Sequence, residues 1–337
     1  MIRPWLVIAV GLAFTAASAA QLKDASPEAQ AACRAARDTP IPAADQPAPS
    51  ERTALLHCDP LDLYYGFDRH PDYDRARKCA YRQLEIEKPS APLFDPAGIL
   101  ATIYANGKGV LRNVDLAIKF ACEAGGAPAE IDGRIQRLEK LRKGDSAEAK
   151  FDLCDDATSG YMEGWCEKIE YRYDEAKLKA RTAKVSSNWS DDQRRAFASL
   201  ARVADRFIRM RVESEVDLSG TGRAASEFEE EDKLRKDFVS SLEEFERGEL
   251  PSFSEAEWRE SDQRLNSIYQ LTQEKSDVIY GTVTPTLIQK TERVWLEYRE
   301  AWVKFGLVKY PSVSLDSWRT WLTQTRIEML SEFARPK

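Results

Sequence analysis

Apolar side chains recur at helical spacing through the last third of the chain. The clearest stretch is 284–306, where apolar positions three and four residues apart form one stripe: Leu287, Val294, Trp295, Tyr298, Trp302 and Phe305. Thr284 suits the N-cap, Pro285 suits the first helical position, and Gly306 is expected to end the helix. The pattern predicts an amphipathic helix over 284–306 that packs its aromatic stripe into a core.

Two more amphipathic segments lie on either side of this helix. Ser254 and Glu257 form a capping box at the start of a segment over 254–275, and another segment covers 314–333. Short loops join the three segments, and helices joined by short loops pack as antiparallel neighbours. The pattern therefore predicts an antiparallel three-helix bundle over 254–337. Residues 171–253 are helical in pattern and strongly charged, and we interpret them as a connector.

A shorter pattern repeats within residues 51–170. Five residues recur at a constant offset, Gly66, Asp74, Ala76, Lys78 and Ala80 in the first copy and Gly107, Asp115, Ala117, Lys119 and Ala121 in the second. A period near 40 is typical of solenoids built from helix pairs, in which glycine allows positive φ at the turn. The second copy resembles the Sel-one-like repeat, which implies a partner-binding surface; a small disulfide-braced helical cap is the alternative. The chain is therefore expected to be all-α, with disulfide-braced helix-pair repeats followed by the bundle.

The first 50 residues differ in composition from the rest. Residues 1–20 place Arg3 before an apolar run and finish in small residues, which is the pattern of a secretory signal peptide. The run is short for a membrane span, so we expect a periplasmic or secreted chain with no membrane attachment after cleavage. Residues 21–50 are rich in Pro and Ala and predict an extended leader, with a short helix over 27–37 capped by Ser26.

All six cysteines follow the predicted signal peptide, and an even count in an oxidising compartment predicts three disulfides. One bridge is expected between the two helices of a predicted pair, one across a short loop, and one by elimination: Cys58–Cys79, Cys154–Cys166 and Cys33–Cys122. A metal site is the competing interpretation. It is disfavoured because the sequence has two histidines and no Cys-x-x-Cys spacing.

Motifs of common catalytic and nucleotide-binding sites are missing from the sequence. It has no Gly-rich phosphate loop, Gly-x-Ser-x-Gly elbow or His-Glu-x-x-His. A paired-carboxylate site at Asp155 and Asp156 lacks a neighbouring acid or base, and His57 beside Cys58 would need a free thiolate. The net charge of −7 without a basic stripe argues against nucleic-acid binding. We expect no catalysis, metal or cofactor; an enzyme of unrecognised type would need perturbed carboxylates in a pocket.

Three short motifs in the C-terminal quarter resemble the LprI-type lysozyme inhibitor family, which comprises small helical modules of the bacterial envelope. They lie in the family's order within 254–333: Leu265 and Asn266 with Tyr269, Gln289 with Trp295 and Arg299, and Leu322 and Thr323 with Arg326. Members often carry two cysteines where this chain has Trp302 and, approximately, Trp318. A packed indole pair is expected to replace that cross-link. Arg299 is interpreted as a structural residue paired with Glu297, Glu300 or Asn266, with a surface anchor as the alternative.

The resemblance implies a protein that occludes a muramidase, and the charge distribution is compatible with a basic target. Residues 213–249 hold thirteen Asp and Glu against five Lys and Arg. Such a run is usually a solvated helix face, but it can also steer a basic partner. The candidate contacts are Lys309 and Tyr310 in the 306–313 loop, together with Glu229, Glu230, Glu231 and Asp232. The alternative is an envelope adaptor that binds its partner through the helix-pair repeats.

Overall fold

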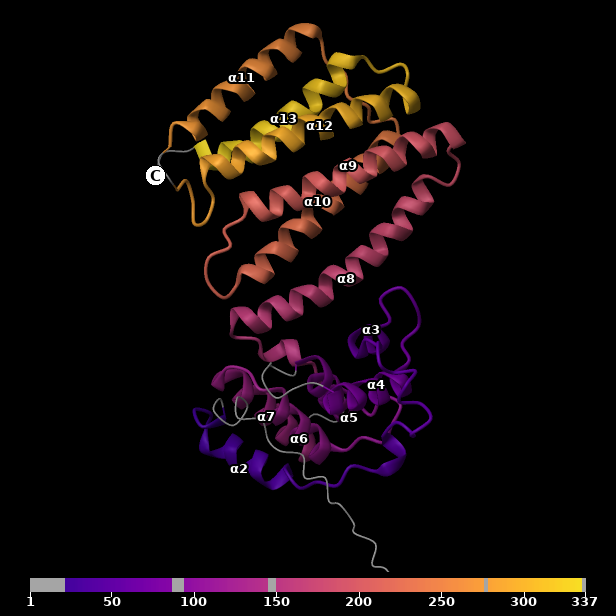
Figure 1. Ribbon diagram of the computed structural model, residues 1–337, viewed down its shortest axis with the longest axis vertical. Helices are drawn as coiled ribbons and strands as arrows, with labels where there is room; N and C mark the ends of the chain where they lie inside the picture. The colour runs from indigo at the N-terminus through magenta and orange to yellow at the C-terminus, as the bar shows by residue number, and fades with distance from the viewer. Residues whose placement is uncertain (1–21, 87–93, 145–149, 276–277, 335–337) are drawn as a thin grey trace, which may run out of the picture. The chain divides into compact units, whose positions relative to one another are not determined.

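The protein is all-α, as the sequence predicts. The computed structural model describes residues 22–86, 94–144, 150–275 and 278–334, and these form two compact units, Met1–Met162 and Glu163–Lys337 (Figure 1). Outside the helices, the extended pairing within the described ranges is an isolated bridge between Tyr280 and Val283. The predicted signal peptide at 1–20 lies outside the described residues. No helix in the described ranges is both long enough and apolar enough to cross a bilayer.

The first unit contains the predicted helix pairs. Its elements are α2 (Pro27–Ala36), η1 (Ala43–Asp45), α3 (Pro60–Tyr65), α4 (Tyr73–Ile86), η2 (Phe94–Gly98), α5 (Ile99–Asn106), α6 (Val114–Ala124), α7 (Pro128–Arg142) and η3 (Leu153–Asp156). Helix α3 packs against α4, and α5 packs against α6. Gly66 ends α3 and Gly107 ends α5, both in the left-handed conformation at φ 60° and 63°. The two copies of the repeat therefore have the same turn, because a residue with Cβ is strained at positive φ.

The short helix predicted over 27–37 is confirmed as α2, whereas the proline-rich residues after it lie against the repeats and do not form a free extended leader. Helix α2 begins at the predicted cap, where Ser26 Oγ accepts from Ala29 N–H, and the helix packs against α6 and α7. Asp45 then lies against the repeats: its carboxylate accepts from Tyr104 Oη at 2.9 Å and its carbonyl accepts from Arg77 Nε at 3.0 Å. Proline-rich composition alone did not predict these contacts, because they depend on groups more than 30 residues away.

The disulfides follow the predicted pairing. Cys58 joins Cys79 between α4 and the residues just before α3, and Cys33 joins Cys122 between α2 and α6. Cys154 and Cys166 are also disulfide-bonded, which is consistent with the bridge predicted between them. Disulfides of this density are typical of proteins that fold in an oxidising compartment.

Glu123 on α6 gives the first unit a pH-dependent stability. Burial raises the pKa of this carboxyl from 4.5 to about 7, with Lys119 acting in the opposite sense. The folded chain therefore binds this proton more tightly than the unfolded chain, so the contribution of Glu123 to stability is full below pH 4.5 and falls as the pH rises to 7. We expect Glu123→Gln to match the wild type in urea denaturation at pH 4 and to exceed it by about 2 kcal/mol at pH 8. An equal difference at both pH values would contradict this assignment.

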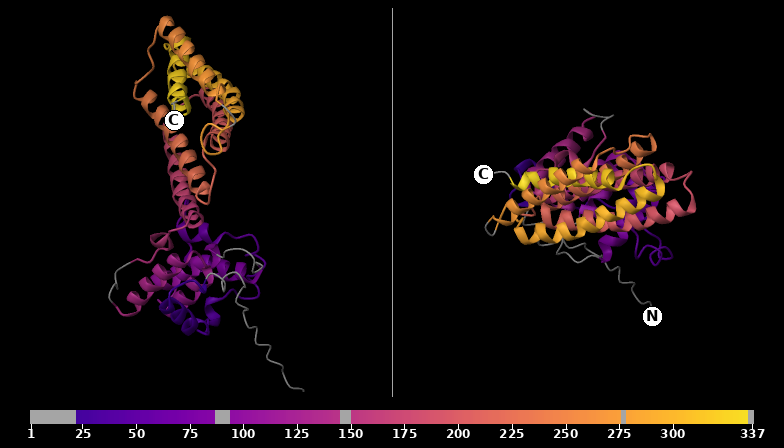
Figure 2. Two further views of the ribbon diagram at one scale, coloured as in Figure 1. Left: turned by 90° about the vertical axis from the view of Figure 1, so that its left-hand side faces the viewer. Right: turned by 90° about the horizontal axis from the view of Figure 1, so that it is seen from above.

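The second unit is larger than the predicted three-helix bundle. It contains most of α8 (Gly160–Val185) and all of α9 (Asp191–Glu215), α10 (Arg223–Glu246), α11 (Glu255–Gln273), α12 (Pro285–Lys309) and α13 (Leu315–Ala334). Helix α12 lies along α9, and α11 lies along α13 (Figure 1, Figure 2). Leu200 of α9 and Phe245 of α10 share one hydrophobic cluster with Trp302 and Trp318. The predicted division between a connector at 171–253 and a bundle at 254–337 is therefore wrong.

Helix α12 does not end at Gly306 as the sequence predicted. It continues to Lys309, and Gly306 instead lets the ring of Trp318 approach the helix backbone. A Cβ atom at position 306 would lie 2.4 Å from Trp318 Cε2. The glycine is thus required for close packing of α12 on α13, and this requirement is invisible in a local pattern.

Trp302 pairs with the indole of Trp321, and not with that of Trp318 as the resemblance led us to expect. The ring centroid of Trp302 lies 5.2 Å from that of Trp321, in an edge-on arrangement. Phe245 from α10 lies against both Trp302 and Trp318, at centroid distances of 5.9 Å and 5.2 Å. An aromatic cluster that includes α10 therefore occupies the place where the resemblance implies a cross-link between two helices.

Candidate binding site

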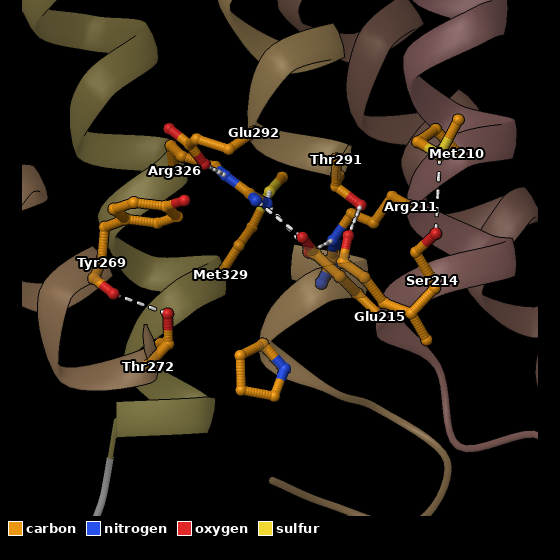
Figure 3. Close-up of polar contacts among 12 residues, drawn as sticks. Met210, Arg211, Ser214, Glu215, Tyr269, Thr272, Thr291, Glu292, Arg326 and Met329 are labelled. Atoms are coloured by element: carbon orange, nitrogen blue, oxygen red, sulfur yellow. Dashed lines mark hydrogen bonds and ion pairs between the residues drawn. The ribbon is translucent and has the colours of Figure 1, made fainter. Parts of the chain in front are cut away.

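A buried ion cluster joins the helices of the second unit. Arg326 of α13 donates two hydrogen bonds to Glu215, the last residue of α9, at 2.6 Å and 2.8 Å (Figure 3). Its Nε donates to Glu292 of α12 at 2.9 Å. The side chains of Arg326 and Glu215 are both 0% exposed. The planar fork of a guanidinium matches a carboxylate in this two-bond geometry, which makes the pair rigid as well as strong.

Arg211 extends the cluster toward the surface. It lies one turn before Glu215 on α9, and its Nε donates to Glu215 Oε2 at 3.4 Å. Its other side forms an ion pair with Glu230 of α10. Four helices, α9, α10, α12 and α13, are therefore connected through alternating charges, in which each buried charge contacts one of opposite sign.

Burial and pairing shift the proton affinities of this cluster in known directions. Burial raises the pKa of Glu292, and Arg326 reduces that effect. For Arg326, burial alone would lower the pKa, but Glu215 and Glu292 together hold it above its ordinary value. Arg326 therefore stays charged, and the charge is compensated within the core.

A hollow of about 660 Å³ lies beside the cluster, and we name it the acidic hollow. Its walls come from the end of α9, the start of α10, the turn around the Tyr280–Val283 bridge and the end of α13. The lining residues are Arg211, Glu215, Val216, Asp217, Ser226, Glu229, Glu230, Lys233, Lys275, Ile279, Tyr280, Glu332 and Phe333. Five of these are acidic and three are basic, so the hollow has a net negative charge.

The carboxylates of the hollow outside the ion cluster, which we call the rim carboxylates, are Asp217, Glu229 and Glu332, and two lysines line the hollow with them. Arg326 and Arg211 compensate Glu215 and Glu230 from within the core. Glu229 and Glu332 are exposed, and the pKa of Asp217 is lowered by hydrogen bonds from Ser219 and by the backbone N–H of Thr282. Tyr280 is 57% exposed and adds an aromatic surface beside these carboxylates. A rim with ionised carboxylates and an accessible ring suits a cationic side chain of a partner.

The residues of the LprI-like motifs fall into buried and exposed groups. Leu265 and Trp295 belong to one hydrophobic cluster, with Tyr269 packed against it, and Leu322 belongs to the neighbouring cluster. Thr323 and Arg326 are also buried, whereas Asn266 and Gln289 are exposed. Most of the motif residues thus stabilise the fold, and among them only Arg326 takes part in the ion cluster that borders the acidic hollow.

Arg299 has the structural role that the sequence analysis favoured. Its guanidinium lies between two indole rings, 5.3 Å from the centroid of Trp258 and 5.2 Å from that of Trp295. Its Nε donates to Glu300 Oε1 at 3.3 Å, so Glu300 is its partner among the three predicted candidates. Asn266 instead bonds to Asp262 on its own helix.

The predicted partner contacts are mostly engaged within the chain. Lys309 forms an ion pair with Glu246 at 3.0 Å, and Tyr310 donates to the same carboxylate at 2.7 Å, so neither belongs to a free loop. On α10, three of the four predicted acidic residues pair with bases, namely Glu230 with Arg211, Glu231 with Arg235 and Asp232 with Lys236. Glu229 is the exposed one, and it lines the acidic hollow.

No pattern in the sequence predicted the roles of Glu215, Arg211, Glu292 and Glu332. Their spacing carries no motif, because Glu215 and Arg326 are 111 residues apart. The residues considered for catalysis have partners within the chain. Asp155 and Asp156 both pair with Arg137, at 2.6 Å and 3.0 Å, and Cys58 is oxidised in a disulfide with Cys79. Among the described residues, no group of three or more His, Cys, Asp or Glu side chains is arranged to hold a metal ion.

No known family model matches the sequence, and neither the curated proteins nor the solved structures include a significant match to the chain. The resemblance to the LprI-type family therefore depends on the sequence motifs, and it stays a prediction.

Proposed function

We propose that the chain is an exported, noncatalytic binding protein of the bacterial envelope, and that its target is a basic muramidase of the lysozyme type. The LprI-like motifs and the predicted signal peptide supply the target class and the periplasmic or secreted location. The disulfides support folding in an oxidising compartment. The chain acts by covering the cleft of the muramidase, without chemistry of its own.

The acidic hollow is the observation that carries this proposal. Its rim carboxylates, Asp217, Glu229 and Glu332, face a space large enough for several side chains of a partner. The buried ion pair joins the end of α9 to the middle of α13 beside the hollow, so the binding surface is held in place before the partner arrives. A preformed surface loses little conformational entropy on binding, and its charge accelerates the encounter with a cationic protein.

The double variant Glu229→Gln/Glu332→Gln tests the hollow. We expect it to weaken inhibition of a basic lysozyme, measured by clearing of a cell-wall suspension, by about tenfold, which corresponds to about 1.4 kcal/mol. Isothermal titration should show the same loss in affinity. The control is Glu244→Gln, which removes an exposed carboxylate of α10 outside the hollow and should leave inhibition unchanged.

Salt gives an independent measurement on the same proteins. Because the rim charges are accessible, raising the ionic strength should weaken binding of the wild type more than binding of the double variant. The proposal fails if full-length protein at micromolar concentration neither inhibits nor binds lysozyme, or if the double variant and the control behave alike.

A second candidate function, an envelope adaptor, is favoured by the repeated hairpins of the first unit. Gly66 and Gly107 make equivalent turns, and stacked helix pairs of this kind commonly form binding surfaces. Photo-crosslinking of the full-length chain in envelope extract distinguishes the two functions. An adaptor should capture partners from probes placed in residues 51–142, whereas an inhibitor should capture a muramidase from probes beside the acidic hollow.

A further inference from the structure

A second concave surface of about 570 Å³ runs between α9 and α12 in the second unit, and we name it the α9–α12 groove. Its lining is predominantly apolar and consists of Ala196, Ser199, Leu200, Val203, Leu296, Glu297, Glu300, Ala301, Lys304, Phe305 and Val308. Leu200 and Phe305 are fully buried beneath it. No residue lines both this groove and the acidic hollow, so the groove offers a separate binding surface.

The outer face of α12 leaves apolar side chains in solvent along the edge of this groove. Leu296 is 42% exposed, Leu307 is 43% exposed and Val308 is 46% exposed. Leu296 and Val308 are the two ends of a row of residues spaced four apart, Leu296, Glu300, Lys304 and Val308, and all four line the groove, whereas Leu307 lies outside it. Clustered exposed apolar residues with charged neighbours are typical of an interaction surface rather than of scattered surface positions.

The charges between these apolar residues are arranged for a second copy of the same helix. Glu300 lies on the N-terminal side of Trp302, and Lys304 lies on its C-terminal side. Lys304 is exposed and forms no ion pair with any other described residue. Two α12 helices that cross antiparallel at the level of Trp302 would set Glu300 of each against Lys304 of the other. The same register sets Leu296 of each against Val308 of the other.

We propose that the α9–α12 groove is the interface of a two-fold symmetric homodimer in which α12 pairs antiparallel with α12 of a second copy. A two-fold axis repeats every contact, so the register gives two Glu–Lys pairs and two Leu–Val contacts from one helix face. Helix α12 has 25 residues and is about 37 Å long, enough for several turns of contact on each side of the axis. The hollow residues take no part, so each copy keeps its own acidic hollow.

Charge reversal at Lys304 tests this register. In Lys304→Glu, each new carboxylate would face Glu300 of the other copy, so we expect the dissociation constant of the dimer to rise at least tenfold in sedimentation equilibrium of the full-length protein. The matched control is Lys290→Glu, which reverses an exposed lysine of α12 outside the groove and should leave the constant unchanged. Circular dichroism and urea denaturation verify that both variants fold.

The charge-swapped variant Glu300→Lys/Lys304→Glu restores opposite charges across the two-fold axis and should recover dimerisation. Glu300 also pairs with Arg299 and Arg319 of its own chain, so replacing it alters contacts within the monomer. A second test therefore leaves Glu300 unchanged. In Ala301→Cys, the introduced thiols lie next to the axis and should cross-link the two copies, whereas Ser252→Cys should not. A chain that is monomeric at 100 μM, or that responds equally to Lys304→Glu and Lys290→Glu, overturns the proposal.

Discussion

Replacing Arg326 by Met should lower the free energy of unfolding by about 3–5 kcal/mol, because it leaves the buried carboxylate of Glu215 without its partner. Met has a similar volume and retains most of the packing, so the loss reports the charge rather than a cavity. Urea denaturation at pH 7.5 measures it. The loss should become smaller as the pH falls, since protonation of Glu292, whose pKa is already raised by burial, removes one of the uncompensated charges.

Two controls separate this effect from a general sensitivity to loss of arginine. Arg319→Met removes a partly exposed guanidinium that contacts Glu300 at 3.3 Å, and it should reduce stability by less than about 1 kcal/mol. Glu215→Gln/Arg326→Met removes both members of the buried pair and should be more stable than Arg326→Met alone. If Arg326→Met unfolds at the same urea concentration as the wild type, the cluster does not hold the helices together.

Gly306→Ala should destabilise the protein by about 3 kcal/mol, although alanine is the better helix former. The added Cβ would lie 2.4 Å from Cε2 and 2.6 Å from Nε1 of Trp318, which is fully buried. An ordinary glycine within a helix would instead gain up to about 1 kcal/mol from the same change. The sign of the measured effect therefore distinguishes close packing from simple helix propensity.

A double-mutant cycle identifies the indole as the cause. Trp318→Leu destabilises the protein by leaving a cavity, but in that background Gly306→Ala should have little further effect because the ring is gone. Additive losses would mean that the cost at position 306 arises elsewhere. Fluorescence-monitored unfolding suffices for the four proteins, since other tryptophans of the cluster, Trp302 and Trp321, remain as probes.

Local rules predicted the helices well. The capping box at Ser254 marks the start of α11, and Thr284 with Pro285 marks the start of α12. The interactions that set these boundaries join residues three positions apart, so the sequence contains all of their members. The helix pairs of the first unit were predicted for the same reason, since each turn depends on one glycine at a fixed place.

The candidate site was predicted only in part. Arg326 and Glu229 were identified, but neither was assigned its partner or its place beside the acidic hollow. The charge excess of residues 213–249 also overstated the free acidic surface, because Glu230, Glu231 and Asp232 pair with bases of α9 and α10. A count of charges along the chain cannot distinguish a carboxylate that faces solvent from one that faces an arginine across a helix interface.

The amino-acid sequence by itself determined the helical class, the helix starts and the Cys58–Cys79 pair, because hydrophobic periodicity, short-range hydrogen bonds and hairpin geometry decide these features. The Cys33–Cys122 pair was reached only by elimination. Which helices face each other was settled by packing in three dimensions. An amphipathic stripe shows that a helix has a buried side, but it does not show which helix packs against that side. For this reason the sequence predicted a connector where α9 and α10 in fact contribute to the core of the second unit. The ion cluster and the approach of Trp318 to Gly306 follow from that choice of neighbours.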